Sequence, residues 1–385
     1  MYTGEIKGNP YGFTDEQIAI GDLAYKIARK YEQFSLGDEV ALGNFWREML
    51  DHGFGSMYLP EAYGGSAQDM LTMAIAFERT STGGFPAAKL VLSQAIFSTI
   101  LLRNGAPEQQ AYWLPKIASG ELLFCFGLTE AQSGSNAPRM NTIARSKGDK
   151  WVINGEKTYI SGVDEAGAIL LAARTPECGD GITLFAIEDH NKKLDKQRVH
   201  LNGWNMYEKQ FTLFLHNLEV GPESVIGEPG KGMRALFDGL NPERLMVAAQ
   251  CVGLGRWGVA KAVGYASERK VFDDVIGRYQ GVQHPLAEAY AKLEAAWALT
   301  VVACRQYDTG DQAGDEANLC KFVAADAGMF AIDACLQTHG GSGFTEETMI
   351  VDRYMILRLQ KTAPVSREMA LNHIARSVLG LPRSY

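Results

Sequence analysis

The pattern of hydrophobic and polar positions changes twice along the chain. Apolar residues recur at helical spacing up to about residue 123, form short strand-like runs to about residue 231, and return to helical spacing afterwards. We therefore expect a helical domain over residues 1–123, a β-domain over residues 124–231 and a second helical domain over residues 232–385. The absence of any long linker or repeat indicates that these parts pack as one unit.

Short motifs predict individual elements in the first two domains. Thr14 and Gln17 form a capping box, which predicts that the first helix begins after Thr14. Two runs of strand-forming residues bounded by polar turns, Gly181–Ile187 and Phe211–Leu215, predict strands. In the last domain, an i, i+3, i+4 stripe predicts a helix that packs in the core. The stripe comprises Leu286, Tyr290, Leu293, Trp297, Val301 and Cys304.

Asn154 and Gly155 predict the turn of a β-hairpin. Both residues tolerate positive φ, and they lie between two runs rich in strand-forming residues, Trp151–Ile153 and Thr158–Ile160. We expect the chain to reverse at this pair and to continue an antiparallel sheet.

The composition limits the classes of function. The chain has 46% hydrophobic residues and a formal charge of −8 with no basic block, which argues against nucleic acid as a partner. The most apolar early run, Leu90–Leu102, is too short to span a bilayer, and the first residues lack the pattern of a secretion signal. We expect a cytoplasmic protein. The six cysteines show no CxxC spacing and the seven histidines no HExxH motif, so we expect free thiols and no metal site.

The segment after residue 127 combines small polar residues in a way that suits a cofactor. Thr129, Ser133, Gly134 and Ser135 offer backbone N–H groups and hydroxyls without bulky side chains, so this loop is able to approach a flat ring or a phosphate closely.

The same segment resembles the flavin signature of the acyl-CoA dehydrogenase family. It reads Leu-Thr-Glu, then Gly-Ser-Asn, then Gly-Asp-x-Trp-Val-Ile-Asn-Gly-x-Lys-x-Tyr-Ile-Ser. Further motifs that resemble the family's first and last helical domains are Leu59–Gly65, Gly105–Pro115, Arg269–Phe272, Gln280 and Gln337–Gly341. The resemblance implies an α+β fold with an N-terminal helical domain, a middle antiparallel β-barrel domain and a C-terminal four-helix-bundle domain.

The resemblance also implies that the chain binds FAD. The matched contact positions within the middle domain are Phe126, Leu128, Thr129, Gly134, Ser135, Tyr159 and Ser161. By similarity, Thr129 and Ser135 would hydrogen-bond the cofactor, Tyr159 would pack against its ring, and Ser161 would donate a hydroxyl near the reactive nitrogen. Taken one at a time, such residues more often satisfy neighbouring backbone groups or pack a core.

A second set of cofactor contacts comes from a neighbouring subunit in this family. The matched positions are Arg269, Phe272, Gln280, Gln337 and Gly341. Arg269 would reach the pyrophosphate, so the resemblance implies a dimer unit and a homotetramer built as a dimer of dimers. The chain departs from the family here, because Asp273 stands where a glycine usually follows Phe272.

The reaction of this family needs a carboxylate that removes a proton next to a thioester. The usual Tyr-Glu-Gly-Thr motif is replaced by Ala363-Pro364-Val365-Ser366. In the isovaleryl-CoA and long-chain type the base lies in an earlier Glu-Arg pair, which matches Glu243 and Arg244. An alternative is that Glu243 only stabilises the first turn of a helix through its dipole, with Glu368 as the remaining candidate base.

Pro364 changes a second part of the family's site. A backbone N–H at this position helps to hold the thioester carbonyl in the family, and a proline has no N–H to donate. Another donor has to compensate, or the substrate sits differently, or the chemistry has changed.

The sequence therefore predicts an FAD-dependent α,β-dehydrogenase of an acyl thioester, with Glu243 as the base and Arg244 orienting either Glu243 or the thioester. Electron-transfer flavoprotein is the possible acceptor. The alternatives are a flavin oxidase or monooxygenase, a dehydrogenase of acyl groups held by a carrier protein, and a non-catalytic relative that keeps the flavin. The smaller side chains at positions 363 and 364 favour a branched or bulky acyl group.

Overall fold

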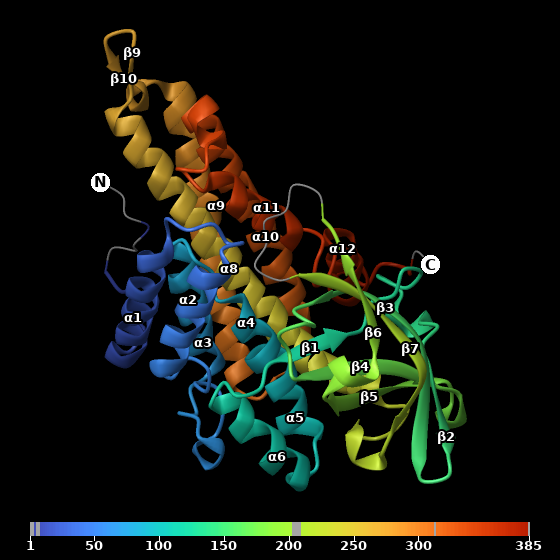
Figure 1. The fold of residues 1–385 in the computed structure, drawn as a ribbon. Helices are drawn as coiled ribbons and strands as arrows, with labels where there is room; N and C mark the ends of the chain where they lie inside the picture. The colour runs from blue at the N-terminus through green and yellow to red at the C-terminus, as the bar shows by residue number, and fades with distance from the viewer. Residues whose placement is uncertain (1–3, 5–7, 202–208, 312, 384–385) are drawn as a thin grey trace. The chain divides into compact units, whose positions relative to one another are not determined.

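The structure, a computed structural model, describes residues 4, 8–201, 209–311 and 313–383. The chain divides into two compact units (Figure 1). The first unit comprises Met1–Asp51, Gln68–Ala87 and Glu243–Tyr385, and the second comprises His52–Ala67 and Ala88–Pro242. In the part that the structure describes, no helix has the length and apolar character needed to cross a membrane.

The first unit consists of helices with one small hairpin. Its helices are α1 (Asp15–Tyr31), α2 (Glu39–Asp51), α3 (Met70–Thr82), α9 (Gln280–Asp308), α10 (Gly314–His339), α11 (Ile350–Gln360) and α12 (Arg367–His373), together with most of α8 (Gly232–Glu268). Strands β9 (Lys270–Val271) and β10 (Asp274–Val275) form the hairpin that follows α8 (Figure 1).

Two predictions for this unit are confirmed. Thr14 caps α1: its hydroxyl accepts a hydrogen bond from the backbone N–H of Gln17 at 3.1 Å, and the Gln17 side chain accepts one from the Thr14 N–H at 3.1 Å. The apolar stripe lies on α9, and every member except Tyr290 is buried there.

Helices α8 and α10 approach each other closely at two glycines. A Cβ added at Gly255 would lie 3.2 Å from the Cα atom of Gly328, and one added at Gly328 would lie 2.6 Å from the carbonyl oxygen of Cys251. Larger residues at these positions would force the helices apart. The contact therefore fixes which faces of α8 and α10 pack together.

The second unit is built around an eight-stranded sheet. The strands are β1 (Phe124–Gly127), β2 (Ile143–Lys147), β3 (Lys150–Ser161), β4 (Ala168–Thr175), β5 (Gly181–Glu188), β6 (Asp195–Val199), β7 (Gln210–Val220) and β8 (Val225–Ile226). Their order is β6-β7-β3-β2-β4-β5-β8, and β1 pairs with β4. The unit also contains α4 (Ala88–Leu90), α5 (Thr99–Asn104), α6 (Pro107–Ala118) and a π-helical stretch over Val91–Ser98.

The predicted closure of this sheet into a barrel is wrong for the described residues, because the two outer strands β6 and β8 do not pair. Strand β8 has only two residues, and β6 carries the exposed charges Asp195, Lys196 and Arg198. Short edges and charged edges both disfavour further pairing. The two strand predictions hold, since Gly181–Ile187 lies in β5 and Phe211–Leu215 lies in β7.

The predicted hairpin turn at Asn154 and Gly155 is also wrong. Strand β3 runs through this pair with a change of register between Ile153 and Gly155, which marks a β-bulge. A Cβ at Gly155 would lie 2.6 Å from the Cα atom of Thr142, so close approach of the neighbouring strand explains the glycine. The chain instead reverses between Lys147 and Lys150, where β2 and β3 begin their pairing.

The sheet of the second unit is buried on both sides. Alternate residues of β4 belong to two different core clusters: one contains Ala168, Leu170 and Ala172 together with helical residues such as Ile96 and Leu114, and the other contains Ile169, Leu171 and Ala173. A strand covered on both faces has a continuous apolar run instead of an alternating one.

Candidate active site

A buried ion pair supports the loop that follows β1. The Nζ atom of Lys157 lies 2.9 Å from Oε1 of Glu130, and both side chains are almost fully buried. Lys157 also donates to the carbonyl oxygen of Leu128 at 3.1 Å, while the Glu130 carboxylate accepts hydrogen bonds from the backbone N–H groups of Asn141 and Thr142. One cluster therefore ties the loop to β3 and to the segment before β2.

The two charges of this pair stabilise each other. Burial lowers the pKa of Lys157 to about 8, and the attraction of Glu130 opposes that change. Burial would raise the pKa of Glu130, but hydrogen bonds from residues 141 and 142 and the nearby ammonium together lower it. Both groups are ionised at neutral pH, so the loop has a rigid support behind it.

The residues expected to contact a flavin belong to this loop and to β3. Thr129 is half-buried and accepts a hydrogen bond from the N–H of Thr158 at 2.9 Å, which joins the loop to β3. Gly134 and Ser135 are exposed, and a Cβ added at Gly134 would meet no described atom within 4 Å. Packing therefore does not require a glycine here, whereas close approach of a ligand to the backbone does.

Tyr159 and Ser161 follow on the same strand. Tyr159 has a φ of +56° and is 60% exposed, although aromatic residues rarely adopt positive φ. Such strain costs about 1–3 kcal/mol and is concentrated at functional sites. The hydroxyl oxygen of Ser161 accepts a hydrogen bond from the side-chain amide of Gln210 at 2.8 Å. The exposed ring on a strained backbone and the oriented hydroxyl are features that fit a flat cofactor.

Two further sequence candidates of the middle domain have a packing role in the structure. Phe126 and Leu128 are partly buried and lie against the core cluster that includes Ile96 and Leu114. Within the second unit, the hydrogen bond between Thr129 and Thr158 joins the loop to the part of β3 that contains Tyr159.

Glu243 lies in the first unit and has the properties of a base. Its side chain is buried, and Oε2 has no hydrogen-bond partner among the described residues. Burial raises the pKa of Glu243 to about 7, and the positive charges of Arg244 and Lys321 oppose this rise. Arg244 is also buried, which lowers its pKa, whereas the neighbouring carboxylate raises it.

The alternative explanation for Glu243, a place in the first turn of a helix, does not apply. Helix α8 begins at Gly232, so Glu243 lies well inside it and the dipole of the N-terminus is remote. Glu368, the other candidate base, is exposed and lies in the first turn of α12. Of the two carboxylates, Glu243 is the buried one and Glu368 the exposed one.

The segment at Pro364 lies between α11 and α12. The carbonyl oxygen of Val365 accepts a hydrogen bond from the ammonium group of Lys321 on α10, and the hydroxyl oxygen of Ser366 caps α12 by accepting from the N–H of Met369 at 3.2 Å. The sequence analysis missed Lys321, Glu130 and Lys157, because burial of a charge depends on contacts between distant parts of the chain.

The residues expected to reach a neighbouring subunit are exposed. They are Arg269, Phe272, Gln280, Gln337 and Gly341, all in the first unit. Phe272 is 87% exposed at the tip of the β9–β10 hairpin, where it and Asp273 both have positive φ. Aspartate is one of the few residues besides glycine that adopts this conformation readily, so the exchange of glycine for Asp273 preserves a tight turn.

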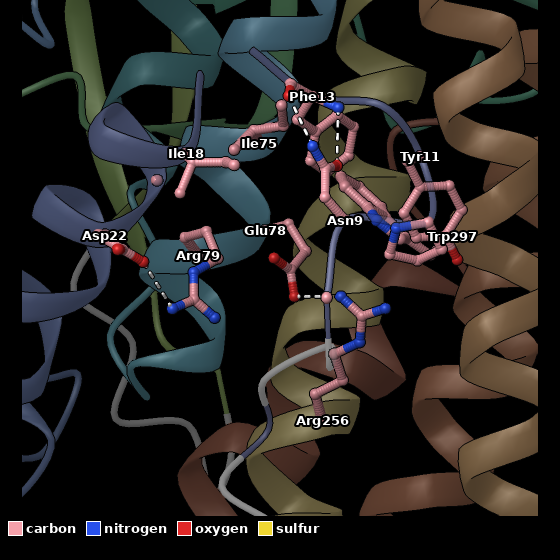
Figure 2. A pocket seen from close by; sticks show the side chains of 13 residues that line it. Asn9, Tyr11, Phe13, Ile18, Asp22, Ile75, Glu78, Arg79, Arg256 and Trp297 are labelled. Atoms are coloured by element: carbon pink, nitrogen blue, oxygen red, sulfur yellow. Dashed lines mark hydrogen bonds and ion pairs between the residues drawn. The ribbon is translucent and has the colours of Figure 1, made fainter. Parts of the chain in front are cut away.

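A cavity of about 230 Å³ lies elsewhere in the first unit (Figure 2). Arg256 is buried in its wall, with Nη1 2.7 Å from Oε1 of Glu78 and Nη2 2.7 Å from Oε1 of Glu294. At the other side Arg79 pairs with Asp22 at 3.4 Å. Because each of these charges already faces an opposite one, we assign the cavity a structural role. No cluster of His, Cys, Asp or Glu in the described part of the chain is arranged to hold a metal ion.

Three family models match successive parts of the sequence. They are the acyl-CoA dehydrogenase N-terminal domain over residues 14–121, the middle domain over residues 125–212 and the C-terminal domain over residues 230–379.

Proteins of known identity match over nearly the whole chain. The acyl-CoA dehydrogenase FadE12 of Mycobacterium tuberculosis (strain ATCC 25618 / H37Rv) is 37% identical, over 93% of this chain and 91% of that protein. The 3-(aryl)acrylate reductase of Clostridium sporogenes (strain ATCC 15579) is 30% identical, over 90% of this chain and 94% of that protein. Among solved structures, the glutaryl-coenzyme A dehydrogenase complex with glutaryl-CoA has a TM-score of 0.91 and 26% identity, and the match covers 97% of this chain and 98% of that chain.

Proposed function

Because the chain belongs to the acyl-CoA dehydrogenase family and is an oxidoreductase, we propose that it catalyses the FAD-dependent α,β-dehydrogenation of an acyl thioester with Glu243 as the base. The observation that carries this proposal is the state of Glu243: a buried carboxylate whose Oε2 has no hydrogen-bond partner in the described part of the chain, with its pKa raised by burial to about 7. A general base works best when its pKa is near the operating pH.

FAD is the cofactor in this proposal. The loop with Thr129 and Ser135 holds it by hydrogen bonds, Tyr159 packs on its ring, and Ser161 donates its hydroxyl. The open space in front of Gly134 and the strained, exposed Tyr159 support this assignment. When bound, FAD supplies an acceptor for the hydride that leaves the β-carbon of the substrate.

The proposed assembly is a homotetramer in which a neighbouring subunit completes the cofactor site. Arg269 is the cation that neutralises the pyrophosphate, and Phe272 covers the cofactor next to it. The exposure of both side chains in the single chain supports this role, because an exposed Arg and an 87% exposed aromatic ring are available for a partner.

The substrate is an acyl-CoA in this proposal, and its acyl group is branched or bulky. Glu243 accepts the α-proton while Arg244, the next residue, orients the carboxylate. Ala363 and Pro364 leave more room than the larger residues that the family carries at these positions. Because Pro364 has no N–H, another donor holds the thioester carbonyl.

Anaerobic reduction of the flavin tests this function. Holoenzyme is mixed without oxygen with straight-chain, branched and aryl-substituted acyl-CoAs, and loss of flavin absorbance is followed for wild type, Glu243→Gln and Glu368→Gln. We expect at least one thioester to bleach wild type and Glu368→Gln, and Glu243→Gln to react at least a thousandfold more slowly.

The remaining outcomes each contradict part of the proposal. Equal bleaching of Glu243→Gln and wild type would remove Glu243 as the base, and loss of bleaching in Glu368→Gln alone would assign the base to Glu368. A chain that binds no FAD, or a bound flavin that no thioester reduces, would contradict the activity itself. Oxygen consumption during turnover would identify an oxidase instead of a dehydrogenase that passes electrons to an electron-transfer flavoprotein.

A further inference from the structure

Lys321 is a buried lysine on α10 with a specific contact. Its side chain is 1% exposed, and its ammonium group donates a hydrogen bond to the carbonyl oxygen of Val365. Val365 directly follows Pro364, in the segment that the family uses as a wall of the thioester site. Lysines are almost never fully buried unless they are paired, so this contact calls for an explanation beyond packing.

The position of Lys321 on α10 directs it toward α8. Gly328, which touches α8 at Cys251, is two helical turns after Lys321, so both residues lie on the same face of α10. The charged and titratable groups around the ammonium are Glu243, Arg244 and Cys251 on α8 and Asp326 on α10. The face of α10 that carries Lys321 is therefore the face that packs against α8, the helix that carries Glu243.

The two groups influence each other's ionisation. Burial lowers the pKa of Lys321 to about 8, and among the nearby groups Cys251, Glu243 and Asp326 oppose this change while Arg244 adds to it. Around Glu243, the charges of Arg244 and Lys321 oppose the effect of burial. The positive charge of Lys321 favours the ionised form of Glu243.

We propose that Lys321 is a positioning residue for the dehydrogenation, because its ammonium group holds the segment at Val365 and supplies positive charge beside Glu243. The inference rests on the proposed function. The side chain thus joins α10, which packs against the helix that carries Glu243, to the segment at Val365. A wholly structural lysine would stabilise the fold without affecting the ionisation of the base.

The pH dependence of kcat/KM tests this role. Lys321→Met keeps an unbranched apolar stem, one atom shorter, but removes the charge. Lys321→Gln keeps a donor for the Val365 carbonyl in case the methionine variant does not fold. We expect the acid limb of the profile to move upward by about one pH unit in either variant, because a nearby positive charge favours the carboxylate. Lys321→Arg, which retains the charge, is expected to restore the wild-type limb.

Lys361→Met is the matched control. Lys361 lies just before the same segment and pairs with Asp326 at 2.7 Å, but its side chain is 29% exposed. We expect its acid limb to match that of wild type. The positioning role would be overturned if the acid limb of kcat/KM stayed at the wild-type pH in both neutral Lys321 variants. It would also be overturned if Lys361→Met moved this limb as far as they do.

Glu243→Gln, measured in parallel, separates this result from failure of the proposed function. If Glu243→Gln is inactive while the neutral Lys321 variants keep the wild-type limb, only the role of Lys321 is wrong. If Glu243→Gln keeps wild-type bleaching, the assigned base is wrong and the role of Lys321 fails with it.

Discussion

Lys157 and Glu130 form a buried ion pair at 2.9 Å that joins two separate pieces of the flavin-signature sequence. Glu130 belongs to the Leu-Thr-Glu piece, and Lys157 lies 27 residues later in β3. Both side chains are buried, so the pair supports the loop without occupying the space in which a cofactor would contact it.

Replacing Lys157 by methionine is expected to destabilise the protein and to weaken FAD binding. The variant leaves Glu130 as a buried charge without its counter-ion, and breaking a buried pair in this way costs about 3–5 kcal/mol. The loop that contains Thr129 also loses its support, so we expect the Kd for FAD to rise on the order of tenfold, which corresponds to about 1.4 kcal/mol. Urea unfolding and quenching of flavin fluorescence measure the two effects.

Lys150→Met is the control for that experiment, because Lys150 lies on the same strand in an exposed pair with Glu219 at 3.1 Å. Exposed pairs contribute about 0–1 kcal/mol, so little change is expected in stability or in FAD affinity. Equal losses in the two variants would contradict a special role for the buried pair.

The pH dependence of the reaction follows from the state of Glu243. Its pKa is raised to about 7 by burial, and only the ionised carboxylate accepts a proton. The value of kcat/KM is therefore expected to fall about tenfold for each pH unit below about 7 and to level off above it, since this profile reports the free enzyme. A profile that is flat from pH 5 to pH 8, measured by anaerobic flavin reduction, would exclude Glu243 as the titrating base.

The cavity wall in Figure 2 gives a prediction about stability alone. Arg256 pairs with Glu78, as Figure 2 shows, and also with Glu294, and the side chains of Arg256 and Glu78 are almost completely buried. Arg256→Met is expected to cost about 3–5 kcal/mol, because Glu78 would remain buried without its counter-ion.

Arg145→Met provides the comparison, since Arg145 forms an exposed pair with Glu177 at 3.3 Å. Its expected cost is below about 1 kcal/mol. Chemical denaturation of both variants measures the difference, and a similar small change in the two would show that the Glu78–Arg256 pair is not needed for the fold.

The hairpin after α8 tests the proposed assembly. Arg269 and Lys270 are neighbouring exposed cations, but only Arg269 is proposed to reach the pyrophosphate. Arg269→Ala is expected to weaken FAD binding by about ten- to a hundredfold, since a hydrogen bond to a charged group contributes about 1.5–3 kcal/mol. Lys270→Ala should leave the Kd for FAD nearly unchanged, and equal effects would indicate a general loss of positive charge.

Short sequence patterns correctly predicted the elements that depend on interactions between residues close together in the chain. The Thr14 capping box depends on residues three apart, and the stripe on α9 depends on helical spacing, so both could be found without the structure. The turn at Asn154 could not be decided in this way, because the same two residues suit a hairpin turn and a bulge. The distinction depends on the neighbouring strand at Thr142, which approaches Gly155 too closely for a side chain.

Residues of the candidate site could be predicted only where they belong to a sequence motif. Thr129, Tyr159 and Glu243 were identified by residue type at matched positions, but their backbone conformation and burial could not be predicted in this way. The positive φ of Tyr159 and the burial of Glu243 inside α8 depend on packing between segments that are distant in sequence. The same is true of Lys321, which no short motif distinguishes from an exposed helical lysine.

Glu243→Gln is expected to lose activity and to gain stability above neutral pH. Since the pKa is raised from 4.5 to about 7 in the folded protein, the unfolded chain releases this proton first as pH rises, and the free energy of unfolding falls between about pH 4 and pH 7. Above pH 7 the ionised group lowers the free energy of unfolding by up to about 3 kcal/mol, because one pKa unit corresponds to about 1.36 kcal/mol.

Replacing Glu243 by glutamine removes this charge, so the rise in Tm over wild type should be larger at pH 8 than at pH 5. Glu368→Gln is the control, and this exposed substitution should change the Tm little. If Glu243→Gln gives the same Tm difference at both pH values, the carboxylate is not held in the destabilised state that a base requires.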